Sequence, residues 1–531
     1  MRIVNLFISC FFFLCHSSDA QQLIISNTEF IGGNLGYTYI RDAISTSDGG
    51  VFFCGQTTDP GSGNIPANTS SVTNSNILIG KLDSNGQREW LKIFGSDVPE
   101  WGTAACEAAD GGFIVVDGSD IDSTSGQFVI HKLNSAGDSV WTRHYGSSLQ
   151  EGPISVTATQ DGGFLIFGFS SGFDGDIPFN YTPQAVFKLW DWVLIKVDSL
   201  GNKQWVKVLG TTGDEWANGK ILTDGQYYYM ISSTQSKDYD CIDTLWHPGL
   251  TKGYNIYVFK LDTTGDVLWS KSYGFGFAST AMLDVRDSTI AIAGIGPDNS
   301  QLLPGNHGDN DMFLLKIDRN GNFIWGRQFG DSNQEWGQTI AAGPGNTYLL
   351  GGYSYMNDQT PYNHIGRYDA WVFWIDSAGI ELGSKIFGNT NYDQLERIQP
   401  LGRSFLAFGR SSASSFTEGT GINPHAPRST PFISTMHFWG LSAPEIGTTE
   451  GDGIIIYPNP AQRMAVVEFR ESHSDGLLQL LSGSGVVLWS HQIPTSLTRL
   501  EIALDQYAKG TYYLEWKPSK GPQKHLKVFL R

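Results

Sequence analysis

The stretch KLDSNGQREWLKIFG at residues 81–95 decides the fold, because copies of it recur along the chain. Four close copies begin at residues 132, 196, 260 and 316, and a less regular copy fills residues 374–388. A second phrase stands between the copies, an apolar run after Asp-Gly-Gly such as DGGFLIFGFS at residues 161–170. Self-similarity with a period of 51–64 residues indicates a repeat architecture.

Each repeat predicts four short strands, A to D. Strand A is rich in small residues, as in TAACEAA at residues 103–109, and a glycine-marked tight turn leads to the almost wholly apolar strand B. Strand C runs into an Asp-x-x-Gly turn, in which Asp can bond its own backbone and Gly can adopt a positive φ. Strand D carries a recurrent Trp and ends at a glycine. Four-stranded units repeated in this way predict the blades of a β-propeller.

The two ends of the repeat region predict how the ring closes. The repeats supply seven A–B pairs and six good C–D hairpins. PFISTMHFWG at residues 431–440 fits a seventh strand C, and LIISNTEFIGG at residues 23–33 ends like a strand D. We therefore expect an all-β protein, with a seven-bladed β-propeller over residues 21–442 whose N-terminal strand completes the last blade and removes the open edges.

The segment before the propeller is typical of a secretory signal peptide. Residues 1–20 combine Arg2, an apolar run and a small-residue cleavage site after Ala20. A lipid anchor on Cys15 is the alternative, although Leu14 stands where such signals prefer a very small residue. No later segment approaches 18 consecutive apolar residues, so no transmembrane span is expected.

Composition narrows the class of partner. Removal of Arg2 and Asp19 with the signal leaves a net charge of 34 − 52 = −18, which argues against a nucleic-acid ligand.

Cys54, Cys106 and Cys241 remain and cannot all pair, so the alternatives are one bridge, such as Cys54–Cys106, or three buried thiols. We expect a monomer.

The C-terminal region predicts a separate domain. Residues 443–453 form a polar, glycine-containing linker. Short alternating strands follow, beginning with IIIYPNPAQRMAVVEF at residue 454 and ending with QKHLKVFLR at residues 523–531. A module of this size with so many short strands indicates a small Ig-like β-sandwich over residues 454–531.

The repeats and the tail each resemble a known family. The repeats resemble the bacterial seven-bladed propeller repeats called SBBP repeats, in the Asp-Gly-Gly turn and the D-A/W-V-x-K-L-D-x-x-G strand, over residues 23–442. This resemblance implies the architecture and little about function. The tail resembles the type A C-terminal sorting domain of the type IX secretion system, through Tyr457–Pro460, Gly510–Leu514 and Lys524–Leu530. It implies that the type IX machinery is a partner and that the mature protein is secreted or attached to the outer surface; an adhesion sandwich is the alternative.

Propeller geometry places the candidate sites. The B–C and D–A connections share one face, here called the long-loop face, and long loops on a rigid scaffold often carry binding sites. The long B–C loops span residues 58–75, 171–190, 235–254, 297–310, 355–369 and 411–431. We expect this face to bind a glycan or a protein ligand. The alternative is an extracellular polysaccharide hydrolase or lyase with a carboxylate-based site on the same face.

An acidic residue recurs at the start of strand A, five residues after the glycine that ends strand D. These strand-A acids are Glu100, Glu151, Glu215, Glu335 and Asp393, with Ser279 and Tyr37 at the position in blades 5 and 1. Glycosidases need two carboxyls in different environments, whereas five equivalent carboxyls suit a task repeated in each blade. We therefore expect the strand-A acids to accept hydrogen bonds from turn N–H groups.

Other candidate residues lie in or near the long loops. The candidate ligand-binding residues are Trp101, Trp192, Trp216, Trp336, Tyr181, His307 and His364. The loop histidines fall in different blades, too far apart for one transition-metal site unless the loops fold inward. Structural calcium is the candidate cofactor, with the ligands Asp174, Asp176, Asp309 and Asp311, although neither stretch has EF-hand spacing and solvated turns are the alternative. No serine elbow, phosphate-binding loop, CxxC pair or HExxH motif points to catalysis.

Overall fold

The computed structural model describes residues 22–530 outside a set of gaps. The gaps are residues 33–35, 60, 68–74, 96–97, 123–124, 182–188, 216–217, 237, 242–253, 285, 297–301, 356–364, 390–391, 403, 413–429, 440–453, 458–463, 470–473, 483–486, 498, 505–506, 508–509 and 521–523. The chain divides into two compact units, one over Leu23–His437 and one that contains Phe438–Arg531.

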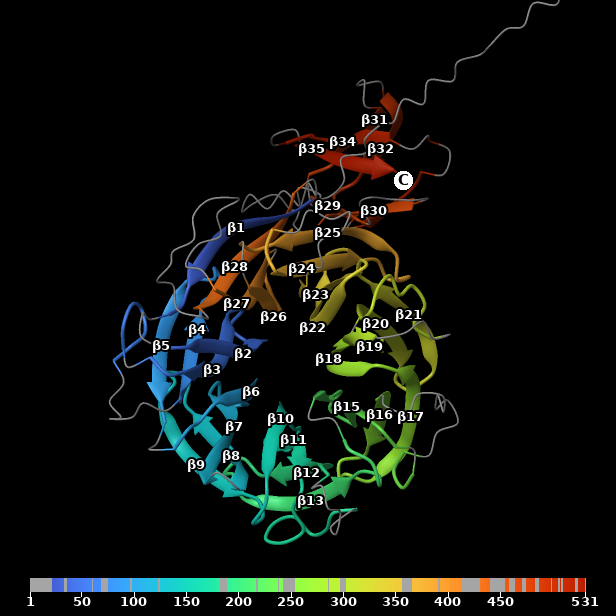
Figure 1. Cartoon of the computed structure of the whole chain (residues 1–531). Helices are drawn as coiled ribbons and strands as arrows, with labels where there is room; N and C mark the ends of the chain where they lie inside the picture. The colour runs from blue at the N-terminus through green and yellow to red at the C-terminus, as the bar shows by residue number, and fades with distance from the viewer. Residues whose placement is uncertain are drawn as a thin grey trace, which may run out of the picture. The chain divides into compact units, whose positions relative to one another are not determined.

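The first unit is a ring of seven four-stranded sheets, each with its first strand innermost (Figure 1). Blades 1 and 2 are β2 (Thr38–Ser45), β3 (Val51–Thr57), β4 (Asn76–Leu82), β5 (Arg88–Phe94) and β6 (Gly102–Glu107), β7 (Phe113–Asp122), β8 (Ser125–Leu133), β9 (Ser139–Tyr145). Blades 3 and 4 are β10 (Glu151–Ala158), β11 (Phe164–Ser170), β12 (Asp191–Val197), β13 (Lys203–Leu209) and β14 (Lys220–Thr223), β15 (Tyr228–Thr234), β16 (Asn255–Leu261), β17 (Val267–Phe275). Blades 5 and 6 are β18 (Phe277–Asp284), β19 (Thr289–Gly296), β20 (Asp311–Asp318), β21 (Phe323–Phe329) and β22 (Gln334–Gly343), β23 (Thr347–Tyr355), β24 (Tyr368–Ile375), β25 (Glu381–Phe387).

Blade 7 closes the ring with a strand from the other end of the propeller. Its sheet has the order β26 (Asp393–Leu401), β27 (Ser404–Ser411), β28 (Thr430–Trp439) and β1 (Gln22–Phe30). The backbone N–H of Ile31 extends this pairing by donating to the carbonyl of Pro431 at 2.9 Å. The predicted seven-bladed propeller, with the N-terminal strand in the last blade, is therefore confirmed.

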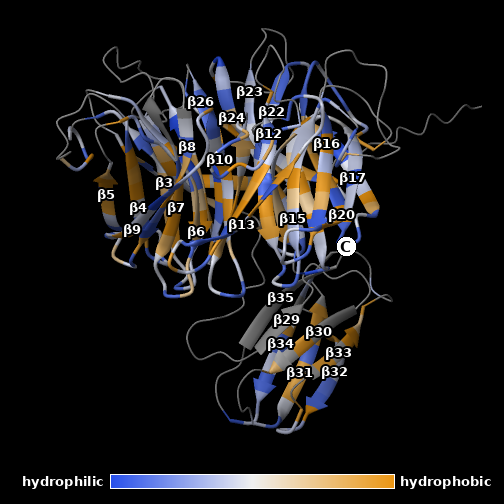
Figure 2. Cartoon of the chain, turned by 90° about the horizontal axis from the view of Figure 1, so that it is seen from below, coloured by the Kyte–Doolittle hydropathy of each residue, from blue (hydrophilic) through white to orange (hydrophobic). Residues whose placement is uncertain are grey.

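The hydrophobic core lies between neighbouring blades. The middle strands are buried on both faces, and β12 is buried at every residue. One core cluster joins Ile114 and Val116 of blade 2 to Ile166, Val193 and Ile195 of blade 3. Figure 2 shows the same pattern, with apolar residues concentrated along the strands and polar residues along the turns. This explains the almost wholly apolar strand B in the sequence, because both of its faces contact another sheet.

The recurrent tryptophan of strand D packs against the Asp-x-x-Gly turn of the next blade. The tryptophan–glycine pairs are Trp90–Gly137, Trp141–Gly201, Trp205–Gly265, Trp269–Gly321 and Trp325–Gly379. A Cβ on any of these glycines would lie 2.7–2.9 Å from a ring atom of the tryptophan, and all five glycines have φ between 73° and 82°. Two independent constraints, a positive φ and a close ring, therefore require glycine at this position.

The recurrent lysine of strand C is buried and donates hydrogen bonds that hold the A–B turn in place. Lys132 is 5% exposed, and its Nζ donates to Asp110 of the Asp-Gly-Gly turn at 2.8 Å and to the carbonyl of Leu133 at 2.9 Å. Lys81, Lys196 and Lys316 make the same contacts with the turn aspartate of their blades.

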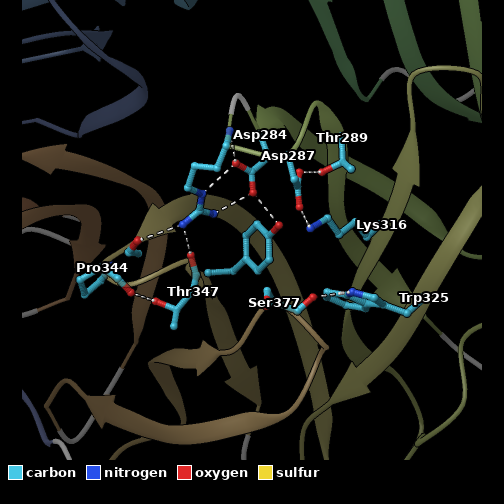
Figure 3. Close-up of polar contacts among 11 residues, drawn as sticks. Asp284, Asp287, Thr289, Lys316, Trp325, Pro344, Thr347 and Ser377 are labelled. Atoms are coloured by element: carbon cyan, nitrogen blue, oxygen red, sulfur yellow. Dashed lines mark hydrogen bonds and ion pairs between the residues drawn. The ribbon is translucent and has the colours of Figure 1, made fainter. Parts of the chain in front are cut away.

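Blade 5 departs from the Asp-Gly-Gly pattern and uses its turn to contact blade 6 (Figure 3). Arg286 donates to Asp284 and also to the carbonyl oxygens of Gly343 and Thr347 in blade 6. Tyr348 donates its hydroxyl to Asp284 at 2.6 Å. Burial opposes ionisation of Asp284, but the bonds from Arg286 and Tyr348 outweigh it and lower the pKa of this carboxyl to about 2.

The second unit contains two sheets that share one core. The first sheet has the order β29 (Ile454–Tyr457), β30 (Met464–Phe469), β33 (Arg499–Ala503), and the second has the order β32 (Val487–Ile493), β31 (Gly476–Ser482), β34 (Gly510–Pro518), β35 (Lys524–Leu530). Val467 and Ile502 from the first sheet pack with Leu478, Leu514 and Trp516 from the second. This arrangement is a small β-sandwich.

The three cysteines after the signal segment are not paired. Cys54, Cys106 and Cys241 are free thiols, so the Cys54–Cys106 bridge does not form. Burial raises the pKa of each thiol, which makes all three poor nucleophiles. Across the described part of the chain, no helix has the length and apolarity needed to cross a membrane.

Candidate functional site

The strand-A acids join neighbouring blades at the long-loop face. In blade 6, Glu335 accepts the backbone N–H of Asp331 at 3.0 Å and the hydroxyl of Ser354 at 2.7 Å. Glu151 accepts the N–H of Ser147 at 2.9 Å and the hydroxyl of Ser170 at 3.1 Å. Each acid thus ties the D–A connection to the end of strand B.

The other blades vary this tie. Asp393 accepts the backbone N–H of Asn389 at 2.7 Å. Glu215 accepts the hydroxyls of Thr211 at 2.6 Å and Thr234 at 3.0 Å. The predicted role, acceptance of turn N–H groups, is confirmed for Glu151, Glu335 and Asp393.

A second carboxyl or amide, from the first residues of strand C, lies beside several of these acids. A Cβ on Gly330 would lie 2.1 Å from Glu335 and 3.0 Å from Asp311, and a Cβ on Gly95 would lie 2.5 Å from both Asn76 and Glu100. The glycine that ends strand D is therefore required by space, because the paired polar groups occupy the position of its side chain.

Burial shifts these carboxyls toward their protonated forms. It raises the pKa of Asp191 to about 7 and the pKa of Glu215 well above its ordinary value, and the charge of Asp191 adds to the shift of Glu215. Burial also raises the pKa of Glu335 to about 8 and that of Asp393 to about 7, with nearby Asp331 and Asp369, respectively, adding to the effect. Raised carboxyl pKa values are common in active sites, but Glu335 and Asp393 are 0% exposed. A ligand on the surface does not reach them.

The register corrects two positions of the repeat. Glu151, Glu335 and Asp393 face Ser170, Ser354 and Ser411 across strands A and B. In blade 1 the residue that faces the end of strand B is Thr38, paired with Thr57, rather than Tyr37. In blade 5 strand A begins at Phe277, opposite Ile295, so Ser279 lies two residues further into the strand. The D–A connections of these blades differ in length, so a fixed spacing after glycine misplaces both residues.

The aspartates expected to bind calcium are engaged in hydrogen bonds within the loops. Asp174 accepts the N–H and the hydroxyl of Ser148, each at 2.8 Å, while Asp176 accepts the N–H of Gly146 at 3.1 Å and contacts Lys203. Asp238 and Asp240 repeat this arrangement in blade 4 on Thr212 and Gly210. An Asp-x-Asp pair in the B–C loop thus clamps the neighbouring D–A connection in two blades.

The second calcium candidate contains a histidine. Asp311 is fully buried and accepts both the backbone N–H of His307 at 2.7 Å and a bond from its Nδ1 at 2.9 Å. Asp309 accepts from Gln334 at 3.1 Å. Within the described ranges no group of three or more His, Cys, Asp or Glu side chains is arranged to hold a metal ion. Calcium binding stays a prediction.

The candidate aromatic residues have different environments. Trp192 is 0% exposed and packs edge-on against Phe259 in the core between blades 3 and 4, so the structure places it in the core rather than on a binding surface. Tyr181 is half-buried and donates its hydroxyl to Asp240 at 2.6 Å. Trp101 is half-buried and donates its backbone N–H to Asp117. Trp216 and His364 lie outside the described residues.

Trp336 belongs to a continuous series of contacting aromatic rings at blades 6 and 7. It is 37% exposed and stacks on Tyr353, with ring centroids 6.0 Å apart and an angle of 7° between the planes. Tyr353 contacts Tyr368, which in turn contacts Tyr355 at 4.8 Å and Tyr392 at 5.0 Å. We call these five residues the aromatic platform.

A cation lies at one end of the aromatic platform. The guanidinium of Arg367 lies over the rings of Tyr355 and Tyr392, at 6.0 and 5.9 Å, and donates to the hydroxyl of Tyr392 at 3.1 Å. Sequence reasoning found Trp336 and missed the four tyrosines and Arg367. The available signal was a departure from the repeat, because strand B of blade 6 ends in GYSY and no other strand B has a tyrosine near this end.

Comparison with known proteins identifies the tail. Residues 455–530 match the family model of the secretion system C-terminal sorting domain. No curated protein sequence matches the chain. The chain is therefore a propeller that carries a type IX sorting domain and is directed to secretion or to the outer surface.

The chain matches solved structures at low similarity. The Pan2 WD40 domain of Neurospora crassa has 11% identity and a TM-score of 0.43, covering 78% of this chain and 96% of that one. A mutant of Synechocystis apocarotenoid oxygenase has 11% identity and a TM-score of 0.38, covering 70% and 94%. Sqt1 from Chaetomium thermophilum has 10% identity and a TM-score of 0.38, covering 78% and 100%. The assignment of the fold rests on the sheet topology described above.

Proposed function

We propose that this protein is a secreted or surface-held binding protein that recognises a glycan through the aromatic platform. The observation that carries the proposal is the exposed indole of Trp336, which stacks on the buried ring of Tyr353 and through it contacts three further tyrosines, of which Tyr392 is exposed. Sugar rings present apolar C–H faces flanked by hydroxyls, and aromatic side chains offer an apolar face with polar groups at the edge.

The platform is held in place before any ligand binds. Trp336 and Tyr353 lie on the paired strands β22 and β23, and Tyr368 lies at the start of β24. Their rings support one another, so little side-chain entropy is lost on binding. Tyrosine hydroxyls and the guanidinium of Arg367 supply hydrogen-bonding groups around the apolar surface.

The hydrolase or lyase alternative needs carboxyls that reach a substrate. Glycoside hydrolysis uses two carboxyls on either side of the scissile bond. Glu335 and Asp393, the carboxyls with raised pKa values nearest the platform in sequence, are fully buried and accept hydrogen bonds from the D–A connections. Binding is therefore the better supported function.

A glycan array with the mature protein tests the proposal. Trp336→Ala should weaken binding of the best glycan at least about tenfold, because an exposed aromatic anchor carries much of such an interface. Phe323→Ala is the matched control, since Phe323 is 41% exposed at the start of β21, beside the C–D turn and away from the long-loop face. Equal binding by both variants, capture of a protein but no glycan, or release of cut sugars would each overturn the proposal.

A further inference from the structure

We infer that the glycan carries carboxylate or sulfate groups, and that a cluster of arginines beside the aromatic platform binds them. This inference rests on the proposed function and names the class of ligand. The arginine cluster consists of Arg41 of β2, Arg397 of β26 and Arg410 of β27, all on blades 7 and 1.

The register places the cluster level with the platform. Trp336 pairs with Tyr353 in blade 6, one residue after the strand-A acid. The equivalent pairs are Gln394–Arg410 in blade 7 and Tyr39–Gln56 in blade 1. Blades 6, 7 and 1 are consecutive around the ring, so these side chains stand at the same height near the long-loop face.

Contacts connect the arginine cluster to blade 1 and to the platform strand of blade 6. The guanidinium of Arg410 lies 5.3 Å from the ring centroid of Tyr39, a cation–π arrangement. Arg397 of the cluster donates its Nη1 to the backbone carbonyl of Gln338, two residues after Trp336 in β22, at 3.3 Å. The arginine cluster therefore adjoins the strand of blade 6 that carries Trp336.

A bulge in strand A turns further side chains toward the same region. The pairing of strands A and B skips Arg41 in blade 1, Gln338 in blade 6 and Glu396 in blade 7. Bulges re-aim side chains at functional surfaces in many sheets. Here they place one cation, one amide and one carboxylate on three adjacent blades.

Positive charge in this cluster exceeds the negative charge available to neutralise it. Arg397 donates to Asp42 at 2.9 Å, Lys220 lies 3.8 Å from the same carboxylate, and Arg410 lies 3.4 Å from Glu396. With Arg41, four cations thus lie near two carboxylates, a local balance of 4 − 2 = +2.

Arg41 is the cation left over. It is exposed, its Nη2 lies 3.4 Å from Gln56 Oε1, and no ion pair to it occurs within the described part of the chain. Although part of its side chain reaches solvent, the surrounding strands partly desolvate the Arg41 guanidinium and lower its pKa; Glu396 raises this pKa, and Arg410 and Arg397 lower it. The surroundings therefore favour an anion beside this guanidinium.

An excess of arginine is unexpected in a chain with a net charge of −18. Screening limits the long-range repulsion of a polyanion to about 8 Å at physiological ionic strength, so the local charge decides whether it binds. Guanidinium groups bind carboxylate and sulfate oxygens through paired N–H donors, and an adjacent aromatic ring supports the sugar. Uronic acids and sulfated sugars both combine these two features.

The test compares matched glycans on the mature protein. The array carries neutral glycans beside uronate-bearing and sulfate-bearing ones, and the two anionic sets separate the two sources of negative charge. We expect anionic glycans to bind best, with affinity falling at least about tenfold between about 50 and about 300 mM NaCl, because salt screens the attraction between arginine and the anionic groups. Arg41→Ala should weaken them at least tenfold.

The matched control removes an arginine elsewhere. Arg143→Ala deletes the same charge from a side chain that donates to the carbonyls of Thr142 and Leu200, in strand D and at a C–D turn. It should leave binding unchanged, and equal melting temperatures would show that both variants are folded. Binding of neutral glycans only, lost in Trp336→Ala but kept in Arg41→Ala, would overturn this inference and leave the proposed function standing. Binding of no glycan would overturn both.

Discussion

The protonated carboxyls between blades should make the stability of the propeller fall as pH rises. Asp393 is the clearest case, because its side chain is completely buried, with 0% of its surface exposed. Burial raises the pKa of this carboxyl from 3.8 to about 7, and the charge of Asp369 adds to the effect. Between these two values the folded state holds a proton that the unfolded state has lost. The stabilisation is complete below the unfolded value and is lost as pH rises through the folded value.

The structure sets the size of this effect. A pKa difference of one unit corresponds to 1.36 kcal/mol, so the interval from 3.8 to about 7 corresponds to about 4 kcal/mol in total. The portion lost between pH 5 and pH 8 is about 2–3 kcal/mol. Asp393→Asn keeps an acceptor for the N–H of Asn389 and does not titrate, so this portion should disappear from its pH profile.

Urea unfolding of the mature protein at pH 5, 6, 7 and 8, followed by tryptophan fluorescence, measures the difference in unfolding free energy between the wild type and Asp393→Asn. That difference should change by about 2–3 kcal/mol across the series, in favour of the variant at high pH. Asp198→Asn is the control: bonds from Asn202 and Leu200 lower the pKa of this exposed group, so it is ionised in both states throughout. Identical pH slopes for the wild type and Asp393→Asn would refute the reasoning.

Three other predictions address the ring, the turns and the tail. Arg397→Ala should lower the unfolding free energy by about 2–4 kcal/mol in urea titrations, because it leaves the buried Asp42 at the ring closure with one cation fewer; an unchanged midpoint would contradict this. Gly379→Ala should cost about 2–4 kcal/mol through backbone strain and the clash with the tryptophan ring, whereas Gly345→Ala, with nothing within 4 Å, should cost only about 1–2 kcal/mol. Deletion of residues 454–531 should leave the propeller in the periplasm in a pulse-chase experiment, and its arrival at the surface would show that export does not need the matched sorting domain.

Most of the fold could be predicted because the repeat displays each constraint several times. A tryptophan that must contact the next turn, a lysine that must tie the A–B turn and a glycine that must have positive φ leave the same letters in five blades. Ring closure could be predicted because the last blade lacks one strand in the sequence and the N-terminal segment supplies it.

The binding surface could not be predicted in the same way. Tyr355, Tyr368 and Tyr392 lie on three connections or strands of two blades, and only the register brings their rings together. Arg41 occupies a bulge, and a bulge has no fixed sequence spacing. Trp192 was misplaced for the opposite reason: a strand buried on both faces shows no alternation that would distinguish a core tryptophan from an exposed one.

The Glu-Trp pair of blade 6 shows how one dipeptide serves both the scaffold and the surface. Consecutive residues of a strand point to opposite sides, so Glu335 enters the joint between blades while Trp336 remains exposed. The joint constrains the acid, because its oxygens must meet a turn N–H and a strand-B hydroxyl. Nothing in the joint constrains the next residue, which is Trp336 in blade 6, Gly152 in blade 3 and Gln394 in blade 7. The acid at the start of strand A is thus fixed by the scaffold in several blades, whereas the residue after it can vary. Specificity for a ligand can arise at these variable positions without a loss of stability.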